Sequence, residues 1–178
     1  EGADAIAQSF SEKKYISTDS VSTIADGIAV KEPGVHTFEL CQQYVDEVVQ
    51  VSEDEICAAI LALIEHHKLI AEGAGAVSVA AAMFNKADIK GKNVCCIVSG
   101  GNIDVTILSR VINRGLMKGG RTTEMLIEMP DRPGSLLGLC NVICRYGANI
   151  ISIHHERNGE SPDVNSCNLR IVLETRNS

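Results

Sequence analysis

The feature that most limits the possible folds is a short, wholly apolar run, Val94–Val98, which lies between two helical patterns. An apolar run without alternation is typical of a strand buried on both faces, as in a parallel sheet covered by helices. Residues 76–84 before the run and residues 104–117 after it both have helical spacing. This alternation of helix and strand predicts an α/β architecture for the first two thirds of the chain.

The clearest helix start is Ser52, which is followed three residues later by Glu55. This spacing is typical of a capping box, in which each side chain accepts a hydrogen bond from a backbone N–H of the first turn. Apolar residues then recur at helical spacing as far as His67. We therefore expect a helix from Ser52 onward. We also expect a strand over residues 45–51 and short helices over residues 3–10 and 37–44.

The pattern restarts after Gly119-Gly120, which predicts two domains, 1–118 and 122–178, joined by a linker at 119–121. The expected order after the linker is strand, helix, strand, strand. The expected elements are a strand at 125–129, a helix at 135–146 that ends before Gly147, a strand at 150–154, a turn at 158–163 and a strand at 164–175. This β-α-β-β order is the first part of a ferredoxin-like fold, so we expect the second domain to be incomplete at its C-terminus.

Composition excludes several classes of function. The net charge is −7, no basic run occurs, and there are three Tyr, three Phe and no Trp, so we expect no nucleic-acid partner. No apolar stretch is long enough to span a membrane, and we expect no membrane partner. The seven cysteines are odd in number and scattered, which favours free thiols in a reducing cytoplasm. Cys140 and Cys144 could share a metal, but no second pair has matching spacing, so we expect no metal site.

Two segments have residues that could carry chemistry. Ser99–Asn102 (SGGN) follows the expected buried strand, and ligands of open α/β sheets bind at the carboxyl ends of strands. Its two glycines would let the backbone approach a ligand closely. Glu72–Gly75 (EGAG) combines a carboxylate with flexible backbone that could face a cofactor. Taken singly, SGGN could equally be a structural turn, and EGAG is more simply explained as a structural segment.

Four segments together resemble a known family. TIADGIAVKEPG (23–34), VSEDEI (51–56), EGAGAVSVAA (72–81) and IVSGGNID (97–104) follow in the order found in the C-terminal part of the catalytic domain of threonine dehydratases and their serine-racemase and serine-dehydratase relatives. The resemblance implies part of a tryptophan-synthase-β-like open-sheet domain. It also implies pyridoxal phosphate as cofactor, L-threonine or L-serine as substrate, and conversion of L-threonine to 2-oxobutanoate and ammonia.

The same resemblance implies roles for individual residues. Ser99 would hydrogen-bond the pyridine nitrogen of the cofactor, and Glu72 would lie close to cofactor and substrate. The residues expected to shape the pocket wall are Gly73, Gly100, Gly101 and Asn102. The chain has no segment matching SxKxRG, which carries the family's Schiff-base lysine, or the phosphate-binding SxGNH. We therefore expect a fragment that is inactive by itself. Ala5 stands where some relatives have an acidic metal ligand, so the expectation of no metal is unchanged.

DRPGSL (131–136) followed by GANI (147–150) resembles an ACT domain, a small regulatory module that binds amino acids. Free N–H groups at the start of the following helix could hold a ligand carboxylate. Asn149 could bind the ligand's amino group or could merely serve the turn after Gly147. The expected effector-binding residues are Asp131, Arg132, Pro133, Gly134, Asn149 and Ile150. Since ACT domains commonly pair side by side, the resemblance also implies a homo-oligomer.

Three hypotheses follow. The first is a fragment of a threonine dehydratase with a regulatory tail, which the SGGN and EGAG segments favour because a pure sensor needs no contact with a pyridine ring. The second is a stand-alone amino-acid-binding regulatory protein. The third is a piece of a serine racemase or serine dehydratase, which the ACT-like tail disfavours. The effector, and with it a biosynthetic or catabolic role, stays open.

Overall fold

The computed structural model describes residues 1–157 and 165–175, and the chain divides into two compact units, Glu1–Gly115 and Leu116–Ser178. Helix α5 (Val105–Lys118) crosses this boundary, and the predicted linker at 119–121 follows directly after it. Each unit has its own cluster of buried apolar residues, as expected of a domain. The boundaries 1–118 and 122–178, and the assignment of these domains to families, stay predictions.

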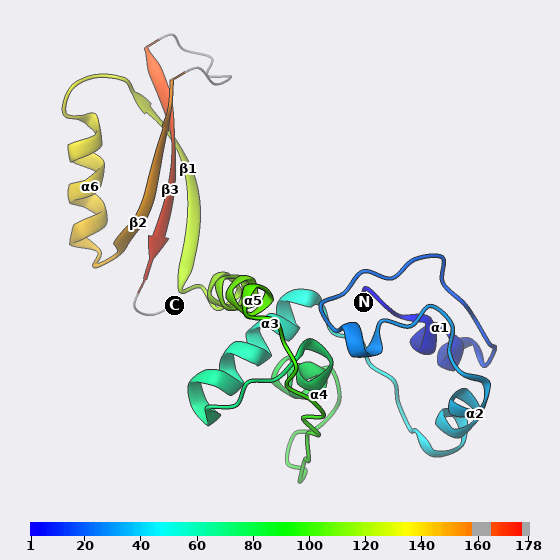
Figure 1. Ribbon diagram of the computed structural model, residues 1–178. Coiled ribbons are helices and arrows are strands. Elements are labelled where there is room, and N and C mark those ends of the chain that lie inside the picture. The colour runs from blue at the N-terminus through cyan, green and yellow to red at the C-terminus, as the bar shows by residue number, and fades with distance from the viewer. Residues whose placement is uncertain (158–164, 176–178) are drawn as a thin grey trace. The chain divides into compact units, whose positions relative to one another are not determined.

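The first unit consists of helices and connecting loops (Figure 1). Its elements are α1 (Ala5–Glu12), a 3₁₀ turn η1 (Asp26–Ile28), α2 (Val35–Tyr44), α3 (Glu53–Ala62), a π-helical turn η2 (Leu63–His67), α4 (Gly73–Met83) and most of α5. The helices expected near residues 3–10, 37–44, 76–84 and 104–117 are confirmed. Helix α4 begins a few residues earlier than predicted, at Gly73, because the glycines of the EGAG segment adopt helical backbone.

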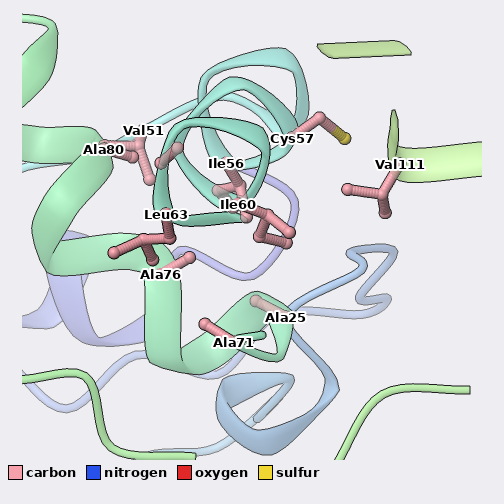
Figure 2. Close-up of a cluster of buried hydrophobic side chains, with 11 residues drawn as sticks. Ala25, Val51, Ile56, Cys57, Ile60, Leu63, Ala71, Ala76, Ala80 and Val111 are labelled. Carbon is pink, nitrogen blue, oxygen red and sulfur yellow. The ribbon is translucent and has the colours of Figure 1, made fainter. Parts of the chain in front are cut away.

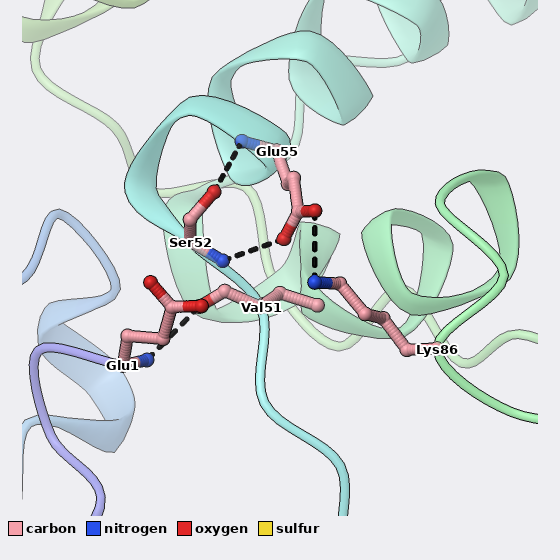
Figure 3. Close-up of polar contacts among 5 residues, drawn as sticks. All are labelled: Glu1, Val51, Ser52, Glu55 and Lys86. Carbon is pink, nitrogen blue, oxygen red and sulfur yellow. Dashed lines mark hydrogen bonds and ion pairs between the residues drawn. The ribbon is translucent and has the colours of Figure 1, made fainter.

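The capping box at the start of α3 is confirmed (Figure 3). Ser52 Oγ accepts a hydrogen bond from the Glu55 N–H at 3.3 Å, and Glu55 Oε2 accepts one from the Ser52 N–H at 2.7 Å. Lys86 Nζ lies 2.9 Å from Glu55 Oε1. Burial alone would raise the pKa of Glu55, but the hydrogen bonds from Ser52 and the charge of Lys86 outweigh it, so the pKa of Glu55 is lowered. The carboxylate therefore joins α3 to the segment that follows α4.

The core of the first unit lies between α3, η2 and α4 (Figure 2). Ile60 is fully buried, and small side chains such as Ala59, Ala76 and Ala80 are also fully buried beside it. Small residues at facing positions allow two helices to pack closely without leaving voids. Helix α5 approaches the same core through Val111, which is 2% exposed. The core therefore rests on the apolar stripe that the sequence pattern predicts for α3.

Two strands predicted in the first unit are wrong. Residues 45–51 and 94–98 form no strand, and Val94 and Ile97 are 50% and 74% exposed. A strand requires neighbours that accept and donate its backbone hydrogen bonds. In the described part of this unit, the run 94–98 is hydrogen-bonded only to Ser78 of α4, through Ile97 O and Cys96 Sγ. The run lies beside α4 but has no partner strand, so the open parallel sheet that was expected is not formed.

The second unit contains a three-stranded antiparallel sheet (Figure 1). Its elements are β1 (Thr122–Pro130), α6 (Ser135–Arg145), β2 (Asn149–Glu156) and β3 (Ser166–Glu174). Strand β3 lies between β1 and β2 and pairs with both in antiparallel register, so β1 and β2 run parallel to each other. The predicted β-α-β-β order is confirmed, and the chain is α/β in this coarser sense. The predicted turn at 158–163 lies outside the described residues.

Helix α6 covers one face of this sheet (Figure 1). Alternate residues of β3 are buried on that face. Leu169 and Ile171 are fully buried, and Ile143 of α6, which is 8% exposed, belongs to the same cluster. Gly147 has a φ of +73°, directly after the C-cap residue Tyr146, as predicted for a glycine that ends a helix. In the described parts of both units, no helix is long and apolar enough to span a membrane.

Candidate functional site

The EGAG and SGGN segments, which are separate in sequence, lie in direct contact. The Glu72 N–H donates a hydrogen bond to Gly100 O at 3.1 Å. The Glu72 carboxylate accepts one from the Asn102 N–H, with 3.1 Å between Oε2 and N. Glu72 is the N-cap residue of α4 but makes no capping bond with its side chain, which is turned toward the SGGN segment instead. The structure therefore brings together the two segments that sequence reasoning singled out for chemistry.

Four glycines, Gly73, Gly75, Gly100 and Gly101, make this contact possible, and we call them the glycine cradle. A Cβ atom on Gly75 would lie 2.6 Å from Gly100 O, and one on Gly101 would lie 2.7 Å from Ile70 O. A Cβ atom on Gly100 would collide with the Glu72 carboxylate, and one on Gly73 with the backbone of Ile24. At these positions backbone packs directly against its neighbours, and no larger residue fits without a shift.

The other two motif segments support the same region. The Ile24 N–H donates to Glu53 Oε2 at 2.8 Å, which joins the TIADGIAVKEPG segment to the start of α3. The ideal Cβ position of Gly27 lies 3.1 Å from the Cβ of Ala74, at the start of α4. Ser78 Oγ donates to Ile97 O at 2.8 Å, which joins α4 to the segment leading into SGGN. All four segments therefore contact one another through α3 and α4.

Ser99 is exposed, and its hydroxyl makes no hydrogen bond with any residue that the structure describes. Its hydroxyl can donate one hydrogen bond and accept others. Asn102 is also exposed, while Glu72 is half-buried. The site therefore presents one uncommitted hydroxyl and one carboxylate that is held in place by a backbone amide. Such a pair can bind a ring nitrogen and a cationic or hydroxyl group.

The predicted effector residues divide into two groups. Asp131, Arg132, Pro133 and Gly134 line a cavity of about 460 Å³ in the second unit. Asn149 and Ile150 do not line it. Asn149 pairs with Glu174 at one end of β3, whereas Pro130, next to Asp131, pairs with Ser166 at the other end. Within one chain the structure brings the first four residues together and leaves Asn149 and Ile150 at the opposite end of the sheet.

Sequence reasoning missed three residues that line the same cavity, namely His155, Arg157 and Cys167. Arg157 Nε lies 3.0 Å from Asp131 Oδ2, and His155 Nε2 lies 3.8 Å from Asp131 Oδ1. The signal was available, because residues two apart on a strand lie on the same face and His155 and Arg157 have this spacing.

The sequence pattern of the pyridoxal-phosphate-dependent enzymes matches residues 1–100. The chain belongs to this family. It is 50% identical over 153 residues to the L-threonine ammonia-lyase of Thermotoga maritima, covering 86% of this chain and 38% of the relative. It is 46% identical over 169 residues to that of Geobacter sulfurreducens, covering 94% of this chain and 42% of the relative. The chain therefore spans less than half the length of these curated relatives.

Solved structures agree with the family assignment. The processed form of threonine deaminase isoform 2 from Solanum lycopersicum superposes with a TM-score of 0.58 at 36% identity, over 64% of this chain and 32% of that chain. Maize serine racemase superposes with a TM-score of 0.56 at 33% identity, over 64% of this chain and 37% of that chain. The backbone of this member of the family thus resembles both threonine deaminases and serine racemases.

Pyridoxal phosphate is the cofactor of this family, and the donor groups of the site fit one end of it. The free hydroxyl of Ser99 suits an unprotonated ring nitrogen, and the close packing of the glycine cradle holds the SGGN segment against Glu72. Two lysines of the first unit, Lys31 and Lys68, fit less well as covalent anchors of the cofactor. Lys31 and Lys68 are exposed, and Lys68 Nζ donates to Glu65 O at 2.7 Å. The described residues therefore fit the ring of the cofactor and not its covalent attachment.

Proposed function

We propose that this chain forms part of the catalytic domain of a pyridoxal-phosphate-dependent L-threonine ammonia-lyase, which converts L-threonine to 2-oxobutanoate and ammonia. The observation that carries the proposal is the contact of Glu72 with the backbone of Gly100 and Asn102, inside the region that matches the family. The similarity to two L-threonine ammonia-lyases extends beyond that region and supports this activity over serine racemisation. L-Serine is the expected second substrate.

In this proposal the cofactor supplies an electron sink, and the chain's residues bind and orient it. The Ser99 hydroxyl donates a hydrogen bond to the ring nitrogen. Because a hydroxyl is a weak acid, it leaves that nitrogen largely unprotonated, which suits elimination. The Glu72 carboxylate, which accepts a hydrogen bond from the Asn102 N–H, would lie close to the cofactor and the substrate. Gly73, Gly100, Gly101 and Asn102 form the wall.

By itself the chain is expected to be inactive. It has no segment that matches the family's lysine and phosphate-loop motifs, and Lys68 is already bonded to a helix-end carbonyl. A first test is to incubate the purified chain with pyridoxal phosphate and L-threonine and to measure ammonia. We expect none above the rate of free cofactor. Ammonia formation that is lost on changing one lysine of this chain would contradict this part of the proposal.

The catalytic proposal is tested with a chimera. Residues of this chain replace the matching 153-residue segment of the Thermotoga maritima enzyme, and 2-oxobutanoate is measured with L-threonine as substrate. We expect activity in the chimera and a loss of kcat in S99A and E72Q. Lys90 is exposed and lies outside the site, so K90A serves as the matched control that keeps activity.

Three outcomes would oppose the proposal. A folded chimera that binds the cofactor but does not consume L-threonine would contradict the proposed ammonia-lyase activity. Interconversion of L- and D-serine without elimination would favour the serine-racemase alternative. Unchanged activity in S99A and E72Q would remove the roles assigned to these residues.

We propose further that the second unit is an ACT-like regulatory domain that binds an amino acid. Its strand order and the cavity beside Asp131–Gly134 support this. Because Asn149 lies at the other end of the sheet, a site that uses both Arg132 and Asn149 requires two copies of the chain, which supports a homo-oligomer. The seven free cysteines support a reducing compartment such as the cytoplasm.

Calorimetric titration of the chain with isoleucine, valine, threonine and serine tests the regulatory proposal. We expect R132A and N149A each to abolish binding. If each site joins two copies, an equal mixture should restore about a quarter of the sites, because roughly half of the dimers are mixed and each mixed dimer has one intact site. Binding that persists in both variants would contradict the proposal. A chain that binds an amino acid while the chimera is inactive would favour the stand-alone regulatory protein.

A further inference from the structure

We propose that Asp131, His155 and Cys167 form a binding site for a single divalent transition-metal ion, with Zn²⁺ as the best match. The three ligand atoms all lie within 4.8 Å of one another. They come from three different elements, the loop after β1, strand β2 and strand β3. No sequence motif joins them, because the sheet alone brings them together.

The register of the sheet fixes two of the ligands. Cys167 is opposite Met129 on β1, and His155 is opposite Leu169 on β3. Residues directly opposite each other in an antiparallel pair point to the same face, and so do residues two apart on one strand. Cys167 and Leu169 are both buried on the α6 side, and His155 therefore projects on that side too.

The backbone places the third ligand beside them. The Asp131 N–H donates to Asn165 O at 2.8 Å, which holds the loop after β1 against the start of β3. Asp131 Oδ1 then lies 3.8 Å from His155 Nε2. This backbone bond fixes the main chain of Asp131 beside the cavity and leaves its side chain able to rotate.

The donor set selects the metal. A thiolate, an imidazole and a carboxylate are the ligands that Zn²⁺ prefers, whereas Ca²⁺ and Mg²⁺ prefer oxygen ligands alone. Zn–S bonds of about 2.3 Å and Zn–N bonds of about 2.0 Å put tetrahedral ligand atoms roughly 3.3–3.6 Å apart. The present separations, all within 4.8 Å, require a contraction of about 1.5 Å at most. Exposed side chains such as those of Asp131 and His155 can make this change by rotation.

Arg157 supplies the outer contact that a metal-binding carboxylate usually has. Its Nε lies 3.0 Å from Asp131 Oδ2, and its Nη2 donates a longer bond of 3.4 Å to Oδ1. With Oδ2 held by the guanidinium, Oδ1 is the oxygen that faces His155. Outer contacts of this kind orient ligands and tune metal affinity.

The site keeps an open position. Three protein ligands leave a fourth place for water or a small molecule, as in catalytic rather than structural zinc sites. That place faces the cavity of about 460 Å³, which Arg132 also lines. The metal would therefore present a coordination position to a small carboxylate or amine. The inference rests on the cluster itself and does not depend on the proposed amino-acid effector.

The test is a titration of the complete chain with Co²⁺, which reports ligand type through its visible and near-ultraviolet absorption, followed by competition with Zn²⁺. We expect one ion per chain, the absorption of four-coordinate Co²⁺ and a thiolate charge-transfer band. C167S should abolish the charge-transfer band, and H155Q and D131N should weaken binding. Because Cys167 is 2% exposed, C167S can disturb the core, and H155Q at an exposed position tests the site independently.

Other cysteines provide the controls. The double variants C95S/C96S and C140S/C144S should bind Co²⁺ like the unmodified chain. Loss of binding in either double variant, or an unchanged spectrum in H155Q and C167S, would overturn the assignment. Metal binding without any amino-acid binding would leave this inference intact and remove only the effector proposal.

Discussion

Ile97 in the first unit and Ile171 in the second are the same residue type, and both lie in segments predicted to be strands. They differ in burial and in secondary structure. Ile97 is 74% exposed and lies in no strand, whereas Ile171 is fully buried at the centre of β3. Ile171 pairs with Met125 on one side and Ile153 on the other. An apolar run thus favours burial, but it becomes a buried strand only where neighbouring strands pair with it.

The largest expected effect is on the second unit. I171A removes a fully buried side chain and should lower the free energy of unfolding of this unit by about 2–5 kcal/mol. The first unit has its own core and should be unaffected. Thiol labelling under increasing urea measures the unfolding of both units in one experiment. Buried Cys57 reports on the first unit, and buried Cys167 reports on the second.

Burial raises the pKa of Cys57 to about 11, so this thiol reacts only when the first unit opens. In I171A, labelling of Cys167 should therefore speed up while labelling of Cys57 stays unchanged. If both thiols become reactive together, the two units unfold as one, and the comparison between them loses its basis.

A smaller effect is expected from the capping box. S52A removes the acceptor for the Glu55 N–H and should destabilise the first unit by about 1 kcal/mol, while S52T should keep most of the stability. Urea unfolding followed by Cys57 labelling measures the change. An equal loss in S52T would show that packing rather than the hydroxyl is responsible.

The Glu55 carboxylate, the other half of the capping box, predicts that the stability of the first unit depends on pH. The pKa of Glu55 is lowered in the folded chain, so its contribution is fully present above its ordinary pKa of 4.5 and is lost as pH falls through the lower folded value. The urea concentration at the unfolding midpoint of the first unit should decrease as the pH is lowered through this range. E55Q should reduce the dependence of that midpoint on pH. A profile that is identical in E55Q would exclude Glu55 as its source.

The smallest effect is expected at Ile97. Because its side chain is largely exposed, I97S should change the stability of the first unit by less than about 0.5 kcal/mol. Repeating I97S in the chimera with the Thermotoga maritima enzyme would sharpen the comparison. A clearly larger loss there would show that the longer chain supplies the neighbours that this run needs.

Local signals explain what the sequence could predict. The capping box at Ser52 and the helix end at Gly147 depend on a few consecutive residues, and both are confirmed. The strand predicted at 94–98 depends on partners that no local pattern reveals. The same limit applies to the site, since the motif resemblance singled out Glu72 and the SGGN segment, but only the structure shows the bond from the Asn102 N–H.

The effector residues show a different limit. Asn149 opens β2, and Asp131 follows the end of β1. Because β1 and β2 run parallel, the start of one strand cannot lie beside the end of the other. The order of elements along the chain did not reveal this separation, because the place of each strand in the sheet comes from the pairing. The cluster of Asp131, His155 and Cys167 required the register as well, which sequence patterns did not provide.

At the candidate site, the glycine cradle sets the backbone frame, and separate side chains supply the chemical groups. Main-chain atoms set the distance between α4 and the SGGN segment, while the side chains of Ser99 and Asn102 remain exposed. A protein engineer who wished to alter cofactor or substrate preference could exchange those two side chains without moving the frame beneath them. A single methyl group added at Gly75 would instead collide with Gly100 O and push the two segments apart.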